Sequence, residues 1–445
     1  MPPHRWNYLI FTGVALVGLT LICARSSVAS ESVVSAVNAI NVAALESLST
    51  SAPTAPQKML AAGALLALRH EDAKAIAMLM PITRSPGARN VRASAYLVLS
   101  DVYCRNQRYL ACYSAIHVAQ EVSPESVNMA YRQAMAFAHA ISGVKPMQLV
   151  HVTPGSLPIT DAKANVIRVP VKIDGHRSGA MLDTGASFST ISASLATRFG
   201  IRMLRHGAAA GSSTRRSVGI RLGMAKQLQI GNATLKNVVF IVVPDSDLPI
   251  PRRLRVGAII GLPVIMTLGR LEFLDSATPT LLYDVQRNQT IVHRDTHSNM
   301  LLSSLTPYVL VHVAGSRAML RMELDTGSNS TIFTKNAMAV APNFFARAQH
   351  YVWHVGGVGG FVKERRALRL PEATLIIGER RVVLKNVIAS SRDSATNDGV
   401  IGANILRGNT RWIMDFKTMT FSVANQRKCG WETPRRARDS QVHAP

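Results

Sequence analysis

The sequence contains the tripeptide Asp-Thr-Gly twice, and each copy follows a short apolar run. Such a run predicts a buried strand that carries the aspartate into a tight loop. Glycine lets the loop turn where a side chain would clash, and threonine can hydrogen-bond to a second loop across a two-fold axis. The residues expected to form and support this site are Asp183, Thr184, Gly185, Asp325, Thr326 and Gly327.

If the two loops meet, Asp183 and Asp325 form a pair of carboxyl groups. Two carboxylates so close cannot both ionise, so the pair shares one proton. The ionised member can act as general base on water while the protonated member polarises a carbonyl group, and the roles exchange as an amine leaves. This chemistry requires no cofactor and no metal, and no Cys/His spacing in the chain matches a zinc site.

An internal repeat supports the pairing of the two motifs. The apolar-apolar-Gly segment at 259–261 returns at 400–402, and Leu-Lys-Asn-Val occurs at both 235–238 and 384–387. Gly261 lies 78 residues after Asp183, and Gly402 lies 77 residues after Asp325. Markers in the same order at nearly equal spacing predict two homologous β lobes, residues 159–296 and 297–425, that build one active site within a single chain.

These motifs resemble those of the aspartic proteases of pepsin and retroviral-protease type. The segment 355–363 is similar to the glycine-rich flap of the retroviral enzymes, and in the first copy only a looser segment, 207–213, corresponds to it. The resemblance implies a fusion of two retropepsin-like halves that hydrolyses a polypeptide bound in extended form. The residues implied to form the flap and bind substrate are Gly356, Gly357, Gly359 and Gly360.

Two neighbours of the second motif predict asymmetry within the pair. Ser328 follows the second Asp-Thr-Gly where Ala186 follows the first, so we expect its hydroxyl group to make Asp325 the more acidic member. Strand alternation places Glu323 on the same side as Asp325, with Arg321 as its expected partner.

The N-terminal segment, residues 1–29, reads as a signal peptide. An uncharged apolar run spans residues 8–24, and Ser27-Val28-Ala29 resembles a cleavage site. The alternative is an uncleaved membrane anchor, since 17 residues are at the short limit for a spanning helix. Either reading predicts export to a bacterial periplasm or secretion.

Between the signal and the β lobes the chain is Ala-rich and predicted to be helical. We expect linkers at 30–56 and 144–158, although a helix can occupy part of the first because Val33, Val37, Ile40 and Ala44 fall at helical spacing. At 57–143 we expect a helical-hairpin, repeat-like domain that resembles tetratricopeptide repeats. The fold class is therefore an N-terminal α-helical domain followed by a mostly β, bilobal acid-protease fold. The helical domain is either a scaffold for a protein partner or a packing domain, and Cys104 and Cys112 are either a disulfide or two buried thiols.

The chain carries 50 Lys and Arg against 26 Asp and Glu, a formal net charge of +24. Such a charge favours anionic partners, but the basic residues are spread along the chain and form no aromatic-interleaved patch, so nucleic-acid binding is not predicted. The tail, residues 426–445, is basic and expected to be disordered. The alternatives to an enzyme are an inactive retropepsin-like peptide-binding module and an envelope scaffold, and lobes could also pair between chains. Two intact motifs favour the enzyme and a monomeric active site.

Overall fold

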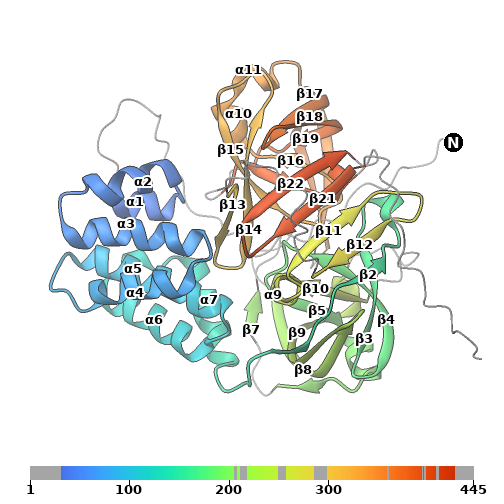
Figure 1. Cartoon of the computed structure of the whole chain (residues 1–445), viewed down its shortest axis with the longest axis horizontal. Helices are drawn as coiled ribbons and strands as arrows, with labels where there is room; N and C mark the ends of the chain where they lie inside the picture. Colours follow the sequence, from blue (N-terminus) through green and yellow to red (C-terminus); the bar gives the residue numbers. More distant parts are fainter. Residues whose placement is uncertain are drawn as a thin grey trace, which may run out of the picture.

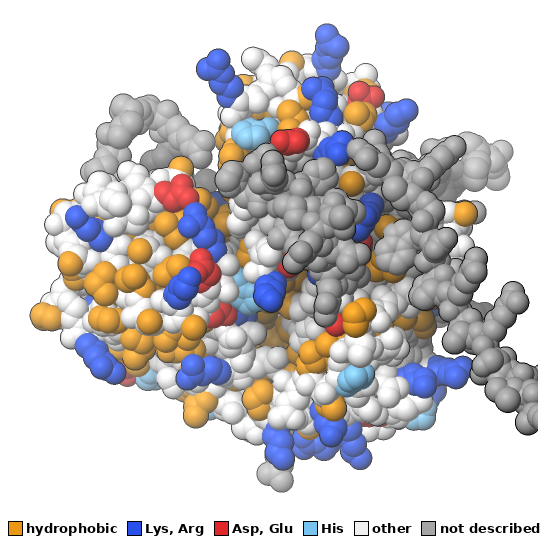
Figure 2. All heavy atoms as spheres, viewed as in Figure 1, with side chains coloured by type: hydrophobic (Ala, Val, Ile, Leu, Met, Phe, Trp, Pro, Cys, Tyr) orange, Lys and Arg blue, Asp and Glu red, His pale blue; other side chains and the backbone are white. Residues whose placement is uncertain are grey.

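The protein has a helical domain beside two β lobes (Figure 1). The computed structural model describes residues 32–204, 208–210, 218–248, 257–284, 298–357, 360–392, 394, 397–406 and 410–425. The predicted signal peptide, the basic tail and Gly359 lie outside the described residues. Within them, no helix is long and apolar enough to cross a membrane. Lys and Arg side chains are scattered over the visible face of the molecule, as their spread along the sequence predicted (Figure 2).

Seven helices form the described part of the N-terminal domain. The first two occupy the stretch 30–56, so the prediction of a linker there is wrong. Ser32 and Asn41 cap these helices by accepting hydrogen bonds from backbone N–H groups, and Leu45 is fully buried. The helices are α1 (Val33–Asn38), α2 (Val42–Ser51), α3 (Ala55–Leu68), α4 (Asp72–Thr83), α5 (Arg89–Arg105), α6 (Tyr109–Val122) and α7 (Met129–Ala140).

A disulfide joins α5 to α6. The helices are separated by a short turn, which brings the Cα atoms of Cys104 and Cys112 within 5.2 Å of each other. This distance is in the range that a disulfide requires. Of the two alternatives that the sequence left open, the structure therefore has the disulfide.

Lobe 1 is built around one large, mostly antiparallel sheet. A tight turn at Asp174-Gly175, where both residues have positive φ, joins the antiparallel strands β3 and β4. The strands are β1 (Gln148–His151), β3 (Arg168–Ile173), β4 (His176–Asp183), β5 (Ser189–Ser192), β6 (Arg202–Met203), β7 (Ala208–Ala210), β8 (Val218–Ile230), β9 (Ala233–Val243) and β10 (Ala258–Gly261). Two short helices, α8 (Ala193–Arg198) and α9 (Leu262–Thr267), follow β5 and β10.

Lobe 2 repeats this connectivity, as the internal repeat predicted. In each lobe the strand before Asp-Thr-Gly lies parallel to the strand of the apolar-apolar-Gly segment: β4 with β10, and β15 with β20. The strands are β13 (Met300–Ser303), β14 (Thr306–Val313), β15 (Met319–Leu324), β16 (Ile332–Phe333), β17 (Gln349–Gly357), β18 (Gly360–Ile377), β19 (Arg380–Ala389) and β20 (Gly399–Ile401). Its helices are α10 (Lys335–Val340) and α11 (Pro342–Phe345).

A third sheet joins the lobes into one unit. Its order is β2 (Gly155–Pro158), β12 (Thr280–Tyr283), β11 (Arg270–Leu274), β21 (Thr410–Asp415) and β22 (Thr420–Asn425). The β11–β21 pair crosses from lobe 1 to lobe 2. The prediction of a linker at 144–158 is wrong as well, because this stretch supplies β1, which pairs with β9, and β2, which pairs with β12.

Candidate active site

Each Asp-Thr-Gly loop rests on the glycine of its own apolar-apolar-Gly segment. Gly261 is the register partner of Asp183, and the Asp325 N–H donates to the Ile401 carbonyl at 3.0 Å. A Cβ atom on Gly261 would lie 2.7 Å from the Ala186 oxygen, and one on Gly402 would lie 2.8 Å from the Ser328 oxygen. The spacing repeated in the sequence therefore has a physical cause, because only glycine fits beneath each loop.

Two hydroxyl groups support these glycines at matching positions. Ser189 accepts a hydrogen bond from the Gly261 N–H at 3.1 Å, and Thr331 accepts one from the Gly402 N–H at 3.3 Å. Each lies six residues after the aspartate of its lobe. Neither residue was predicted as part of the site, although their equal offset from the aspartates is visible in the sequence.

The two threonines link the loops by four hydrogen bonds. The Thr184 hydroxyl donates to the Leu324 carbonyl at 2.6 Å, and the Thr326 hydroxyl donates to the Leu182 carbonyl at 2.9 Å. Each hydroxyl also accepts from the backbone N–H of the opposite threonine, at 3.0 Å in both cases. The structure thus brings together two motifs that are 142 residues apart and holds them in a nearly two-fold arrangement.

The two carboxyl groups meet between the lobes. Asp183 lies against the opposite loop so closely that any Cβ on Gly327 would clash with its carboxyl group. Both aspartates are 0% exposed. Asp325 Oδ1 accepts hydrogen bonds from the N–H groups of Gly327 and Ser328, at 2.8 and 3.1 Å. The Asp183 carboxyl group lies beside the Asp325 carboxyl group and the backbone of Gly185 and Ala186. In the described part of the chain, however, neither Asp183 oxygen has a partner at hydrogen-bond geometry, and the same is true of Asp325 Oδ2.

This difference assigns the proton. Burial, and then the neighbouring Asp325 charge, raise the pKa of Asp183 well above its usual range. Burial raises the pKa of Asp325 to about 7, and hydrogen bonds that include those from the Ser328 and Gly327 N–H groups counteract the rise. In the shared-proton state, the two backbone N–H donors at Asp325 Oδ1 favour Asp325 as the ionised member and a proton on Asp183.

The predicted cause of this asymmetry is wrong, although Asp325 remains the more acidic member. The Ser328 hydroxyl group does not serve the carboxylate. It donates to the Ser330 carbonyl at 2.7 Å, and the N–H group of Ser328 is what reaches Asp325.

Ser328→Ala is therefore expected to leave the pH dependence of the dyad unchanged, because every backbone donor to Asp325 remains. The measurement is the pH–rate profile of peptide cleavage by wild type and variant. Displacement of either limb of the profile by a full pH unit would show that the hydroxyl group acts on the carboxylate after all.

Glu323 lies where strand alternation placed it, on the same side of β15 as Asp325, but its partner differs from the prediction. It is 3% exposed and accepts a hydrogen bond from Asn397 Nδ2 at 3.0 Å. Arg321 is directed to the helical domain instead, where it donates to backbone carbonyl groups. Burial, and then the neighbouring Asp325 charge, raise the pKa of Glu323 well above its usual range.

The predicted flap residues lie at the tip of a long hairpin in lobe 2. β17 and β18 pair up to Gly357, which lies opposite Gly360, and Gly356 lies opposite Phe361. Gly359 falls outside the described residues. In lobe 1 the corresponding hairpin contains β7 and β8, and β7 contacts α7 of the helical domain.

The helical domain covers the face of lobe 1 that bears Asp183. Side chains alternate along strands, so Met181 shares the face of Asp183, and Ile259 is its partner on β10. Both are 1% exposed and pack in one apolar cluster with side chains of α5, α6 and α7. Phe137 of α7 packs against Phe188 with 4.1 Å between ring centroids and an interplanar angle of 33°. The alternate residues of the same strands, Ala180, Leu182, Ala258 and Ile260, pack in the core of the lobes.

The corresponding face of lobe 2 is covered as well. Tyr308, the cross-strand partner of Glu323, packs in an apolar cluster with α1 to α5. Arg321 on the same face donates to the Ala39 and Ile40 carbonyls, both at 2.7 Å. The helical domain thus contacts the dyad-bearing face of each lobe.

The helical domain also makes polar contacts with lobe 2. Buried Arg105 donates to the Leu302 carbonyl at 3.3 Å and forms an ion pair with Asp72. His70 Nδ1 lies 3.2 Å from the Phe416 carbonyl oxygen. These residues hold α3, α4 and α5 against lobe 2, beside the lobes as Figure 1 shows.

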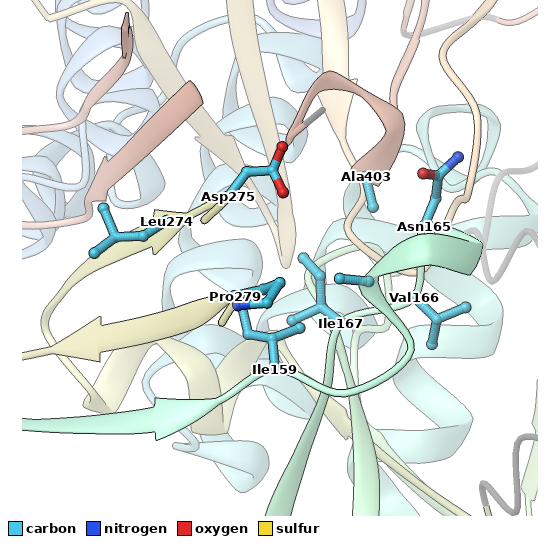
Figure 3. A pocket seen from close by; sticks show the side chains of 9 residues that line it. Ile159, Asn165, Val166, Ile167, Leu274, Asp275, Pro279 and Ala403 are labelled. Carbon is cyan, nitrogen blue, oxygen red and sulfur yellow. The ribbon is translucent and has the colours of Figure 1, made fainter. Parts of the chain in front are cut away.

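A shallow pocket between the lobes is separate from the dyad (Figure 3). Its lining is mostly apolar, and Ala403 is the residue that lobe 2 contributes to it. Asn165 on its wall donates to the Asn329 carbonyl at 2.9 Å and so links the lobes. Neither Asp183 nor Asp325 lines this pocket. In the described ranges, no cluster of three His, Cys, Asp or Glu residues could hold a metal ion.

A family model matches part of lobe 1. Residues 169–264 match the model of a family described as aspartyl protease, a range that includes the first Asp-Thr-Gly and Gly261. Among solved structures, the chain matches a retropepsin-like aspartic protease from Rickettsia conorii at 15% sequence identity and a TM-score of 0.21, over 31% of this chain and 94% of that one. No curated protein matches at a significant level. The family match and the repeated topology confirm the predicted resemblance to aspartic proteases and the bilobal acid-protease fold.

Proposed function

We propose that the protein is an aspartic endopeptidase whose dyad, Asp183 and Asp325, lies within one chain. The observation that carries this proposal is the set of four threonine hydrogen bonds, which fixes the two loops so that their carboxyl groups meet. The intact dyad argues against an inactive peptide-binding module or an envelope scaffold, because neither needs two buried acids in contact.

The reaction follows from the assigned proton. The Asp325 carboxylate takes a proton from water as the water oxygen bonds to the substrate carbonyl carbon, and Asp183 gives its proton to the carbonyl oxygen. When the C–N bond breaks, Asp325 passes its proton to the leaving nitrogen, and a hydroxyl group of the intermediate returns one to Asp183. The products are a carboxylic acid and an amine, and the dyad is restored.

The substrate is proposed to be a polypeptide bound in extended form beneath the hairpin of β17 and β18. Main-chain groups of an extended peptide can pair with a strand edge, so affinity need not depend on side chains alone. We further propose that the protein acts after export, in a periplasm or outside the cell, either free or held by an anchor at residues 8–24. The disulfide of α5 and α6 is compatible with an oxidising compartment.

We also propose that the helical domain keeps the enzyme latent. Both dyad-bearing faces contact this domain, and both aspartates are fully buried. In this proposal, movement of the helical domain opens the approach of a peptide to the carboxyl groups, and a protein partner that binds the helices supplies the free energy for that movement.

The test is cleavage of a diverse peptide mixture by the full chain between pH 3 and 8, read by mass spectrometry, with and without a statine peptide as transition-state mimic. Cleavage that the statine blocks, and that Asp183→Asn and Asp325→Asn each remove, is the expected result. The same assay is run with Phe137→Ala, which loosens the cover. No cleavage by either protein at any pH would overturn the proposal and favour a peptide-binding module.

A further inference from the structure

The side chains at equivalent positions beside the two aspartates of the dyad differ in polarity. Met181 and Glu323 each lie two residues before the aspartate of their lobe. Ile259 pairs with Met181 in one parallel strand pair, and Val400 pairs with Glu323 in the other. The positions therefore correspond in sequence and in register, but one side chain is an apolar thioether and the other a carboxyl group.

Among the residues that the structure describes, lobe 2 offers this carboxyl group no cation. Asn397 Nδ2 donates to one oxygen of Glu323, and Tyr308 is its neighbour across the strand pair. In the described part of the chain no Lys, Arg or His forms an ion pair with Glu323, and the Arg321 guanidinium binds the Ala39 and Ile40 carbonyls. Burial and the neighbouring Asp325 charge raise the pKa of this carboxyl group and so favour its protonated form in the free chain. A lysine or arginine side chain that enters the position shifts the balance to the carboxylate and forms a charge-assisted hydrogen bond with it.

The near-two-fold arrangement decides which substrate side chain meets Glu323. Successive side chains of an extended peptide point to opposite sides. A peptide whose scissile bond lies at the dyad therefore directs the two flanking side chains toward opposite lobes. One of them meets Met181 and Ile259, and the other meets Glu323, Val400 and Tyr308.

We propose that Glu323 is a specificity-determining residue that selects a lysine or arginine side chain on one side of the scissile bond, while Met181 selects an apolar side chain on the other. This inference rests on the proposed endopeptidase function. It narrows the substrate class to polypeptides with an apolar–basic junction at the cleaved bond.

The experiment first identifies a cleaved bond in the peptide mixture, using whichever of the full-length wild type and Phe137→Ala is active. Peptides are then made in which each flanking residue in turn is lysine or norleucine, which has a similar length and no charge. The readout is the ratio of kcat/KM for the lysine peptide to kcat/KM for the norleucine peptide. A ratio is informative even where a variant loses some activity through poorer folding.

The expected ratio for Glu323→Gln is at least tenfold lower than for the unsubstituted protein, at one flanking position only. Glu323→Met, which copies lobe 1, should favour norleucine at that position. Met181→Glu is the reciprocal variant and should raise the preference for lysine at the other flanking position.

Two results would overturn the specificity proposal while leaving the protease intact: norleucine preferred at both positions by the unsubstituted protein, or the same ratio in Glu323→Gln. If no peptide is cleaved by any protein with an intact dyad, the proposed function itself fails, so the two failures are distinguishable.

Discussion

Asp183→Asn and Asp325→Asn are each expected to lower peptide cleavage by roughly a thousandfold and to raise the thermal unfolding midpoint at neutral pH. The loss of activity follows from removal of the general acid or base, which contributes about 10²–10⁴-fold to such reactions. The gain in stability follows from removal of a fully buried carboxyl group. At neutral pH the folded chain must either retain a proton on this group that the unfolded chain would release, or ionise the group without contact with water.

The sign of the pH dependence follows from the raised pKa values. Burial raises the pKa of Asp325 from 3.8 to about 7 in the folded chain. Its contribution to stability is therefore fully present below about pH 4 and is lost as the pH rises through 7. At pH 7.5 this loss amounts to a few kcal/mol at most, because each tenfold change in a protonation equilibrium corresponds to about 1.4 kcal/mol. The difference in unfolding midpoint between Asp325→Asn and wild type should accordingly grow from pH 4.5 to pH 7.5.

Asp415→Asn is the matched control for the stability measurement. Asp415 is also buried, but it lies 3.7 Å from Arg270 and accepts hydrogen bonds from the N–H groups of Lys417 and Thr418. Removing its charge should lower the unfolding midpoint at both pH values. If the unfolding midpoint of a dyad variant also falls at both pH values, the dyad is not a destabilising, proton-sharing pair.

Phe137→Ala is expected to raise the rate of peptide cleavage by the full chain at least tenfold. The Phe137 ring packs against Phe188, five residues after Asp183, and so anchors α7 beside the Asp-Thr-Gly loop of lobe 1. Truncating a buried phenylalanine costs about 3–5 kcal/mol of stability. If about 1.4 kcal/mol of this cost destabilises only the state in which the helical domain covers the site, the population of the uncovered state rises tenfold. The measurement is kcat/KM on a peptide that the wild type cleaves slowly.

Leu79→Ala controls for general loosening of the helical domain. Leu79 of α4 is fully buried and packs against Gly63 of α3, so its truncation weakens the domain without removing a contact to the catalytic loop. Equal activation by both variants would show that the Phe137–Phe188 contact has no special role. No activation by either, in an enzyme that is already active, would show that the helices do not restrict access.

The extent of what could be predicted differs sharply between elements. Residues 30–56 are rich in Ala, Ser and Pro, which predicted a linker, yet Leu45 and its neighbours are buried in a helical core that lobe 2 helps to form. Composition reports local preference, whereas these short helices depend on long-range burial for their stability. The strands β1 and β2 were missed for the same reason, since their partners lie more than 80 residues further along the chain.

The sequence by itself determined the dyad, the repeated lobes and the positions of the supporting glycines and threonines. Those features depend on local backbone geometry and occur once in each lobe, so their repeated spacing could be recognised in the sequence without a structure. Only the tertiary structure decided that Asn397 rather than Arg321 binds Glu323, that the Ser328 N–H rather than its hydroxyl group reaches Asp325, and that α7 covers Phe188. Each of these depends on which side chains the folded chain brings together or on how a loop turns, and strand alternation predicts the side a residue faces but not what it meets there.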